Sequence, residues 1–508
     1  MNKDIKTLSY IYSVRIYTAV ITIVLIPALI AQIGIEAYGL IGFFTVLQAC
    51  LSILDAGVGG VLTRESIISK NSLSGFTRFN VLYKKVVFFF IILALVLSFV
   101  GWLICQRYSM SWLNTSLASE TVITCTTLMF WIFSLRYIQG PFRSIILSNE
   151  SQLTLTTINF ISITLSQPIT LLFLKIYNGD IVFYFIIQLI VAFISSGIII
   201  ACGERIRKKI LTECKEKNND ERCVDNKTSF KNLFLFALQL STLSILWILV
   251  NQSDKLALTK YISLSQYGIY SVAVSVISIL AIFSDPLNQF LQPRLTKFYH
   301  ERQFDSYLIM FLNAFRFICI LTIPLSAFLI FYSEEIVFIW SNDFYLATQV
   351  AKYLPWLFIG GVFAAYSNFI FLLLYSFGNL KKHTLVYTIF SLIVIPANIY
   401  IAKTYFGEGT SIFFAVSSII LFATWGGYNF MRAFSDGIKL LIIYILPLFV
   451  IEIAYFKLTE AINFNTENRL LLFLVLAILG VIGVGIALIY HWFINRVNPA
   501  TSYRLIRK

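Results

Sequence analysis

The residues of this sequence that could do chemistry are a few charged side chains set inside long apolar stretches. Arg15, Arg136 and Arg316 each fall within or at the end of such a stretch. A charged side chain at the bilayer centre costs about 2.5 to 3.5 kcal/mol on the insertion scale, so these residues should face protein or water. The planar guanidinium group makes bidentate, permanently charged hydrogen bonds to phosphate. Arginines that line a cavity would therefore favour an anionic guest such as a phosphate or a pyrophosphate.

A simpler interpretation is open for each of these arginines. A long basic side chain near a helix end can extend to the lipid headgroups and bind no substrate. Arg136, which stands near the end of its apolar stretch, is the candidate to which this applies most directly.

Polar stripes follow several of the apolar stretches at helical spacing. They consist of Arg15, Thr18 and Thr22; Thr45, Gln48, Ser52 and Asp55; Asn159, Ser162, Ser166 and Thr170; and Ser271, Ser275, Ser278 and Asp285. Small hydroxyl residues also pack membrane helices together without touching a substrate. Asp55 and Asp285 each precede an arginine, Arg64 and Arg294, by nine residues. A structural ion pair and a role in ion coupling are therefore both open for these carboxylates.

The apolar stretches that carry these residues are long enough to cross a membrane. Of the 508 residues, 58% are apolar and 13% are charged, against about 25% charged residues in a soluble domain. A helix needs about 20 residues to cross the hydrocarbon core. Fourteen stretches qualify, namely 9–33, 39–62, 83–105, 119–140, 153–176, 181–202, 233–251, 262–290, 311–333, 350–377, 384–405, 409–432, 438–458 and 468–494. Because none shows the period-two alternation of a membrane barrel, we predict an all-α integral membrane protein with about fourteen transmembrane helices.

The distribution of basic residues predicts the orientation of the helices. About 28 of the 39 lysine and arginine residues fall in the N-terminal tail and in every second loop after it. The positive-inside rule then places both termini in the cytoplasm. The net charge of +14 is spread over many short loops and forms no single basic face, which argues against nucleic-acid binding.

An internal repeat divides the chain. Tyr38, Gly39, Asp55, Arg64, Pro168, Tyr177, Gly179 and Asp180 recur 228 to 230 residues later as Tyr267, Gly268, Asp285, Arg294, Pro396, Tyr405, Gly407 and Glu408. The repeat spans about six helices, an even number, so the two copies should be related by a pseudo-two-fold axis along the membrane normal. We predict two six-helix lobes, residues 1–202 and 232–432. A cytoplasmic basic linker, residues 203–231, joins them, and residues 433–508 form two further helices and a cytoplasmic tail. Paired lobes that expose a site alternately to each side are the plan of a transporter.

Enzyme chemistry has little support in the sequence. The three histidines stand near predicted helix ends, so neither a metal site nor histidine catalysis is expected. The seven cysteines form no Cys-x-x-Cys pair and fit buried structural thiols. No nucleotide-binding loop of the G-x-x-x-x-G-K-[ST] type occurs. We therefore expect no enzyme, no metal and no cofactor.

Three segments of the chain resemble a known family. They are Glu36-Ala-Tyr-Gly-Leu through Asp55-Ala-Gly-Val-Gly to Arg64; Ser253-Asp-Lys-Leu-Ala-Leu-Thr-Lys-Tyr followed by Tyr267-Gly-Ile-Tyr; and Phe377-Gly-Asn-Leu-Lys-Lys-His with Tyr405-Phe-Gly-Glu-Gly. In their order and spacing they resemble the O-antigen flippases, which are Wzx-type polysaccharide exporters of the multidrug/oligosaccharidyl-lipid/polysaccharide (MOP) superfamily. The resemblance covers essentially the whole chain, including the twelve-plus-two helix count.

The resemblance implies a flippase of the bacterial inner membrane. Its substrate would be an oligosaccharide repeat unit linked to undecaprenyl pyrophosphate, with the phosphates held in a cationic cavity between two lobes. The candidate ligands are Arg15, Arg64, Arg136, Arg294 and Arg316, and the candidate ion-pair or coupling residues are Asp55, Asp254, Lys255 and Asp285. The resemblance also implies coupling to a gradient of H⁺ or Na⁺. Membrane lipids and other polysaccharide-assembly membrane proteins are the expected partners.

Two other functions compete with this one. A multidrug exporter of the same superfamily would share the fold, but such proteins usually carry an acidic residue deep in the first helix, where this chain has Arg15. A membrane glycosyltransferase or an O-antigen polymerase should have a large external loop, and the glycosyltransferase often an Asp-x-Asp motif. The chain has no Asp-x-Asp, and no predicted external loop exceeds about twenty residues. A flippase is therefore the function that we expect.

Overall fold

The computed structural model describes residues 2–55, 58–69, 73–149, 151–216, 230–378, 380–461, 468–497 and 504–505. Within these ranges the regular structure is helical, apart from one isolated antiparallel bridge between Phe434 and Leu505. Thirteen of the helices are long and apolar enough to cross a membrane. The prediction of an all-α integral membrane protein is confirmed, because in lipid a helix satisfies its own backbone hydrogen bonds.

The seventh predicted span, residues 233–251, differs from the other thirteen. It falls on helix α9 (Phe230–Tyr261), which is not among the thirteen helices that qualify. The side chains of residues 233–241 lie outside the part of the chain that the structure describes. The end of α9 that is described carries Asp254, Lys255 and Lys260, which lower its mean hydropathy.

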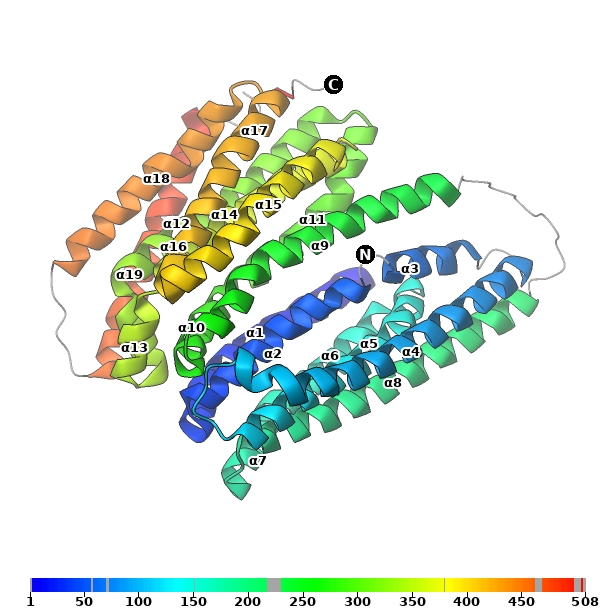
Figure 1. Ribbon diagram of the computed structural model, residues 1–508. Coiled ribbons are helices and arrows are strands. Elements are labelled where there is room, and N and C mark those ends of the chain that lie inside the picture. The colour runs from blue at the N-terminus through cyan, green and yellow to red at the C-terminus, as the bar shows by residue number, and fades with distance from the viewer. Residues whose placement is uncertain are drawn as a thin grey trace. The chain divides into compact units, whose positions relative to one another are not determined.

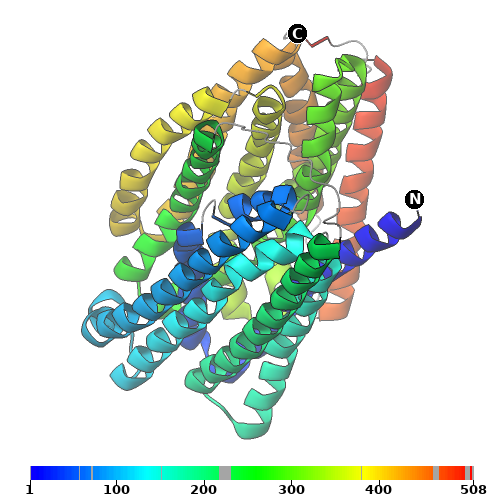
Figure 2. The same ribbon diagram turned by 90° about the vertical axis from the view of Figure 1, so that its right-hand side faces the viewer.

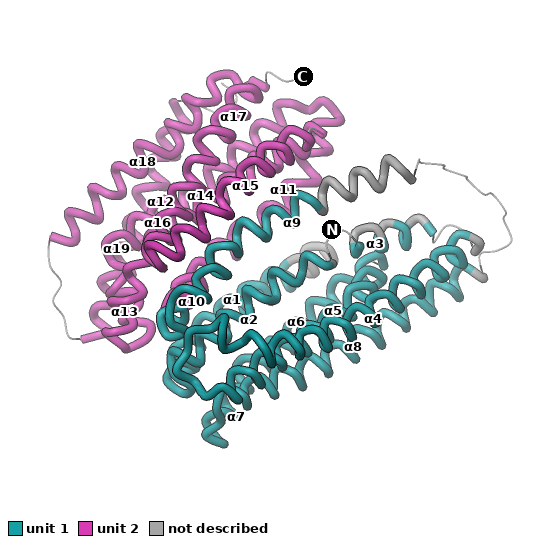
Figure 3. Tube along the Cα trace, in the orientation of Figure 1, with its two compact units in different colours: residues 1–268 teal, residues 269–508 magenta. Residues whose placement is uncertain are grey.

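The chain forms two compact units, Met1–Gly268 and Ile269–Lys508 (Figure 3). The first holds α1 (Asn2–Ile33), α2 (Ile35–Leu51), the 3-10 turn η1 (Ser52–Asp55), α3 (Val58–Ser69), α4 (Leu73–Trp112), α5 (Ser119–Ser148), α6 (Gln152–Thr164), the π segment η2 (Leu165–Ile169), α7 (Thr170–Tyr177), α8 (Ile181–Glu216), α9 and the start of α10 (Leu264–Ile277). Helix α9, which we expected to open the second lobe, packs on α2 in the first unit. The grouping of the helices into six, six and two stays a prediction.

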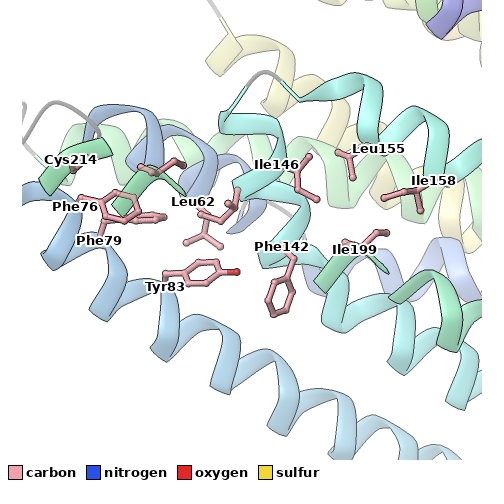
Figure 4. Packing of buried hydrophobic residues seen from close by; sticks show 12 residues of the cluster. Leu62, Phe76, Phe79, Tyr83, Phe142, Ile146, Leu155, Ile158, Ile199 and Cys214 are labelled. Atoms are coloured by element: carbon pink, nitrogen blue, oxygen red, sulfur yellow. The ribbon is translucent and has the colours of Figure 1, made fainter. Parts of the chain in front are cut away.

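Helix α5 is the centre of the first unit. It packs against α3, α4 and α8, as Figure 1 shows in its blue and cyan region. A buried cluster fills the space between α3, α4, α5, α6 and α8 (Figure 4). It consists of Leu62, Phe76, Phe79, Tyr83, Phe142, Ile145, Ile146, Leu155, Ile158, Ile199, Ile210 and Cys214. Because lipid is as apolar as these side chains, their close packing rather than a hydrophobic driving force holds the helices together.

Helix α2 and the start of α10 touch backbone to backbone. A Cβ atom added at Gly39 would lie 2.4 Å from the carbonyl oxygen of Leu264, and one added at Gly268 would lie 2.2 Å from the carbonyl oxygen of Ile35. Such an approach is possible only for glycine, as at other small-residue crossings of membrane helices. Gly39 and Gly268 are one of the two glycine pairs that the sequence repeat relates, the other being Gly179 and Gly407. The repeated Tyr-Gly pair therefore marks a crossing of two helices.

Hydrogen bonds hold the loop before α5 against the same crossing. Glu36, at the start of α2, accepts hydrogen bonds from the hydroxyl of Thr115 at 2.7 Å and from the backbone amide of Ser116 at 2.7 Å. The backbone amide of Leu264 donates to the carbonyl of Asn114 at 2.7 Å. Four segments therefore meet at one end of the unit: the start of α2, the loop after α4, the end of α9 and the start of α10.

Helix α12 is the centre of the second unit. The unit holds α11 (Ile279–His300), α12 (Phe304–Ser341), α13 (Phe344–Ala351), α14 (Leu354–Ser376), α15 (Leu380–Thr404), α16 (Phe406–Leu421), the π segment η3 (Phe422–Gly426), α17 (Gly427–Ala433), α18 (Gly437–Glu460) and α19 (Arg469–Val497). Helix α12 packs against α11, α13, α14, α18 and α19, and α19 lies beside it in Figure 2. The two C-terminal helices are thus part of the second unit's core.

Alanine at either crossing glycine should destabilise the protein. Gly39→Ala or Gly268→Ala would place a methyl group on a backbone carbonyl, and overpacking of this kind costs about 1–3 kcal/mol or more. We expect each variant to lower the thermal unfolding midpoint of the purified protein in detergent. Gly197→Ala on α8 is the matched control, since a Cβ there meets nothing within 4 Å. Equal midpoints for Gly39→Ala and Gly197→Ala would contradict the crossing.

Candidate functional site

Arg136 lies inside the first unit, on the middle part of α5. Its apolar run ends near residue 140, but α5 continues to Ser148, so Arg136 is farther from the helix end than the sequence suggested. Its guanidinium carbon lies 5.9 Å from the centre of the Phe44 ring on α2, and Tyr184 of α8 is an electrostatic neighbour. Arg136 therefore lies beside an aromatic ring of α2.

Arg15 is half-buried on α1, which packs against α6. Two tyrosine–threonine hydrogen bonds join these helices, Tyr10 to Thr157 and Tyr17 to Thr164, each at 3.1 Å between the hydroxyl oxygens. At 3.6 residues per turn, Tyr10 and Tyr17 share one face of α1 and Arg15 lies on the other side, so these two bonds do not position it.

The hydroxyl groups of the predicted polar stripes mostly bond to their own helices. Thr18 and Thr22 donate to carbonyls four residues earlier. Thr45 donates to Gly42, and Ser275 to Ser271. This is the local bonding that hydroxyl residues make in membrane helices without a substrate, so it assigns them no binding role.

Asp254 and Lys255 form an ion pair on α9. The Lys255 ammonium group lies 3.0 and 3.1 Å from the two carboxylate oxygens of Asp254, and it also donates to the carbonyl of Asn251 at 2.8 Å. The Asp254 carboxylate is buried. A buried carboxylate needs such a partner. The contacts therefore fit a structural ion pair, which was one of the two roles predicted for these residues, the other being ion coupling.

Arg294 is the exposed cationic candidate of the second unit. Its guanidinium carbon lies 3.5 Å from the centre of the Phe290 ring, one turn earlier on α11. Phe290 lines an open groove of about 490 Å³ between α11 and α12. The other lining residues are Leu287, Leu291, Phe298, Ser306, Ile309, Met310, Asn313 and Ala314. The second unit therefore places an exposed arginine next to an apolar groove.

Arg316 has a different environment from the cavity that we expected. It is buried on α12, where its Nε donates to the hydroxyl of Tyr444 on α18 at 2.7 Å and an Nη donates to the side-chain oxygen of Asn495 on α19. Its guanidinium carbon also lies 5.0 Å from the centre of the Tyr444 ring. Arg316 therefore joins the two C-terminal helices to α12. Sequence reasoning missed this role because the partners are more than 120 residues away.

Three candidates cannot be placed as side chains. Asp55 ends η1, Arg64 lies on α3 and Asp285 lies on α11, but all three side chains lie outside the described part of the structure. Their roles as ligands or ion pairs stay predictions. Across the residues that the structure describes, no group of three or more His, Cys, Asp or Glu side chains could hold a metal ion.

Comparison with known proteins identifies the family. The family described as polysaccharide biosynthesis protein matches residues 5–299, more than half of the chain. The chain belongs to this family. Among proteins with curated functions, none matches it in sequence.

Two solved structures share the fold of this chain. The lipid II flippase MurJ, in an inward closed conformation, matches with a TM-score of 0.65 and 15% identity, over 96% of this chain and 99% of its own. An inward-facing multidrug resistance MATE family transporter of the MOP superfamily matches with a TM-score of 0.56 and 12% identity, over 83% of this chain and 94% of its own. Both likenesses show the fold that the resemblance to the MOP superfamily implies. Both relatives are transporters, which is consistent with the expectation that the chain is not an enzyme.

Loss of the Arg316 contacts should loosen α18 and α19. We expect Arg316→Leu to lower the thermal unfolding midpoint, because it leaves the buried Tyr444 hydroxyl without this partner, and such a loss costs about 1–3 kcal/mol. Arg316→Lys should recover only part of it, since an ammonium group cannot reproduce the two directed guanidinium bonds. Arg496→Leu is the control, because Arg496 is exposed and stacks on Trp492 of its own helix. An unchanged midpoint in Arg316→Leu would refute the anchoring role.

Proposed function

We propose that this protein is a flippase of the bacterial inner membrane. It moves an O-antigen repeat unit, linked to undecaprenyl pyrophosphate, from the cytoplasmic to the periplasmic leaflet by alternating access. A gradient of H⁺ or Na⁺ drives the cycle. The pyrophosphate is bound by arginines, and the five candidates are Arg15, Arg64, Arg136, Arg294 and Arg316. Arg316 is the weakest of them, because its guanidinium group is already bonded inside the protein.

The match to the polysaccharide biosynthesis family, together with the fold of a lipid flippase, carries this proposal. The likeness to MurJ extends over 96% of the chain, which leaves fewer residues unmatched than either α18 or α19 contains. The two helices beyond the twelve-helix repeat therefore have counterparts in a protein that is named as flipping a lipid-linked substrate.

The surroundings of Arg294 suit a lipid with an anionic head. Exposed guanidinium groups bind phosphate oxygens through charge-assisted hydrogen bonds, and a groove lined by leucine, isoleucine and phenylalanine accepts an apolar chain. Both features lie side by side on α11. This is the chemistry of a polyprenyl pyrophosphate.

A multidrug exporter is the second candidate, because the MATE transporter has the same fold. Two observations favour the flippase. The likeness to the MATE transporter covers less of this chain, and helix α1 carries Arg15 near its middle, where such exporters usually carry an acidic residue. A cation at this place favours an anionic substrate rather than a cationic drug.

Deletion of the gene tests the proposed function. The deletion strain should lose surface polysaccharide and retain lipid-linked repeat units on the cytoplasmic face of the inner membrane. A plasmid copy of the gene should restore both. Normal surface polysaccharide in the deletion strain would rule out the flippase, and sensitivity to drugs without any polysaccharide defect would favour the multidrug exporter.

Replacement of Arg294 tests the phosphate contact. The loss of charge-assisted hydrogen bonds worth about 1.5–3 kcal/mol predicts that Arg294→Ala lowers export roughly 10- to 100-fold, with Arg294→Lys in between. The measurement is surface polysaccharide per unit of membrane-inserted protein in complemented cells. Lys297→Ala is the matched control, because Lys297 is an exposed cation one turn later that pairs with Glu301 at 3.7 Å. Wild-type export by Arg294→Ala would remove Arg294 from the site.

A further inference from the structure

A carboxylic acid is buried in the three-helix bundle formed by α12, α18 and α19. On α18 the buried side chains Tyr444, Leu448, Glu452 and Phe456 recur every four residues, which is one face of a helix. On α19 the buried positions include Leu479, Gly483, Ala487 and His491. Helix α12 packs against both helices. The side chain of Glu452 is the carboxylate of this interface, and it is 0% exposed.

Neither carboxyl oxygen of Glu452 has a hydrogen-bond partner among the described residues. Gly483 of α19 lies against this group: a Cβ added there would lie 3.2 Å from one of these oxygens and 2.8 Å from the Phe456 ring. The space occupied by the carboxyl group thus exists because residue 483 has no side chain. Phe456, Phe328 and Tyr332 form an aromatic wall on the side of α12.

The titratable and charged groups near Glu452 provide no compensating charge. On α18, the nearby Tyr455 donates its hydroxyl proton to the carbonyl of Leu479. On α12, the hydroxyl of Tyr332 donates to Thr459. The guanidinium group of Arg316 donates its hydrogen bonds to Tyr444 and Asn495. On α19, Arg469 and Arg496 lie near the two ends of the helix, each about 20 Å from Gly483, and His491 lies about 12 Å from Gly483.

An ionised carboxylate in this place would be very unfavourable. Transfer of an unpaired charge into an apolar medium costs far more than a folded protein can offset, so the group takes up a proton instead. We propose that Glu452 is a proton-binding site, protonated while α19 covers it and able to release the proton only when α18 and α19 separate. The site is distinct from the arginine candidates and does not depend on the proposed function.

His491 gives the same interface a second titratable group. It is buried, its two ring nitrogens have no hydrogen-bond partner among the described residues, and its ring lies 5.7 Å from that of Tyr444. Glu452 and His491 are therefore both held neutral by the closed packing of α19. Separation of α18 and α19 would let Glu452 lose its proton and His491 gain one. Protonation and helix packing are therefore linked.

Infrared spectroscopy tests whether Glu452 holds a proton. The full chain in lipid vesicles at neutral pH should show the carbonyl stretch of a protonated carboxylic acid, and Glu452→Gln should remove that part of the band. Glu460→Gln is the matched control, because Glu460 is an exposed carboxylate at the end of the same helix. An identical band in wild type and Glu452→Gln would show that Glu452 is ionised and would overturn the proposal.

The pH dependence of stability tests the link to packing. The folded protein keeps the Glu452 proton at a pH where the unfolded chain has lost it, so stability must fall as the pH rises. The wild-type unfolding midpoint should drop between about pH 5, just above the pKa of a free glutamate, and alkaline pH by several degrees more than that of Glu452→Gln. Parallel pH profiles of the two proteins would overturn the proposal, whatever the result of the export assays.

Discussion

Two membrane helices can touch at their backbones only where neither carries a side chain, and α2 and α10 meet at such a point. Gly39 and Gly268 each lie against a carbonyl of the other segment. The bonds from Glu36 to the loop at Thr115 and from Leu264 to Asn114 depend on that distance. Even one methyl group between the helices would separate all of these groups. The local order of the first unit at this end therefore rests on two hydrogen atoms in place of side chains.

The second unit is held by a different kind of interaction. Helix α12 binds α18 and α19 through a buried arginine and through closely packed aromatic rings, and Arg316 supplies directed bonds to both helices. A few residues along the same interface, Glu452 and His491 lack such bonds. At one end of the interface, Arg316 is bonded to both C-terminal helices. Farther along it, Glu452 stays neutral only while the helices are packed together.

Much of this architecture could be predicted from the sequence. Apolar run length gave the helices, because a span in lipid must satisfy its own hydrogen bonds. The repeated Tyr38-Gly39 and Tyr267-Gly268 pairs marked a true contact, although the repeat alone could not show that the two glycines meet. The surroundings of the arginines were harder to predict, because the partner of a buried charge is set by the tertiary fold. Arg316, which was expected to line a cavity, bonds to Tyr444. Glu452 was not among the candidates, although it is the lone carboxylate of the run 438–458, because only the packing of Gly483 shows how it is enclosed.

The π segment η2 shows how one helix of the first unit can bend without losing polar contacts. Pro168 stands inside Leu165–Ile169, where it cannot donate the hydrogen bond of a regular helix. Gln188 of α8 donates to the carbonyl of Ser166 in this segment, at 2.5 Å. The side chain of one helix thus bonds to the backbone of another inside the π segment. Any change in the bend at Pro168 must then move or release Gln188, so the shape of α6 and α7 is mechanically tied to the position of α8.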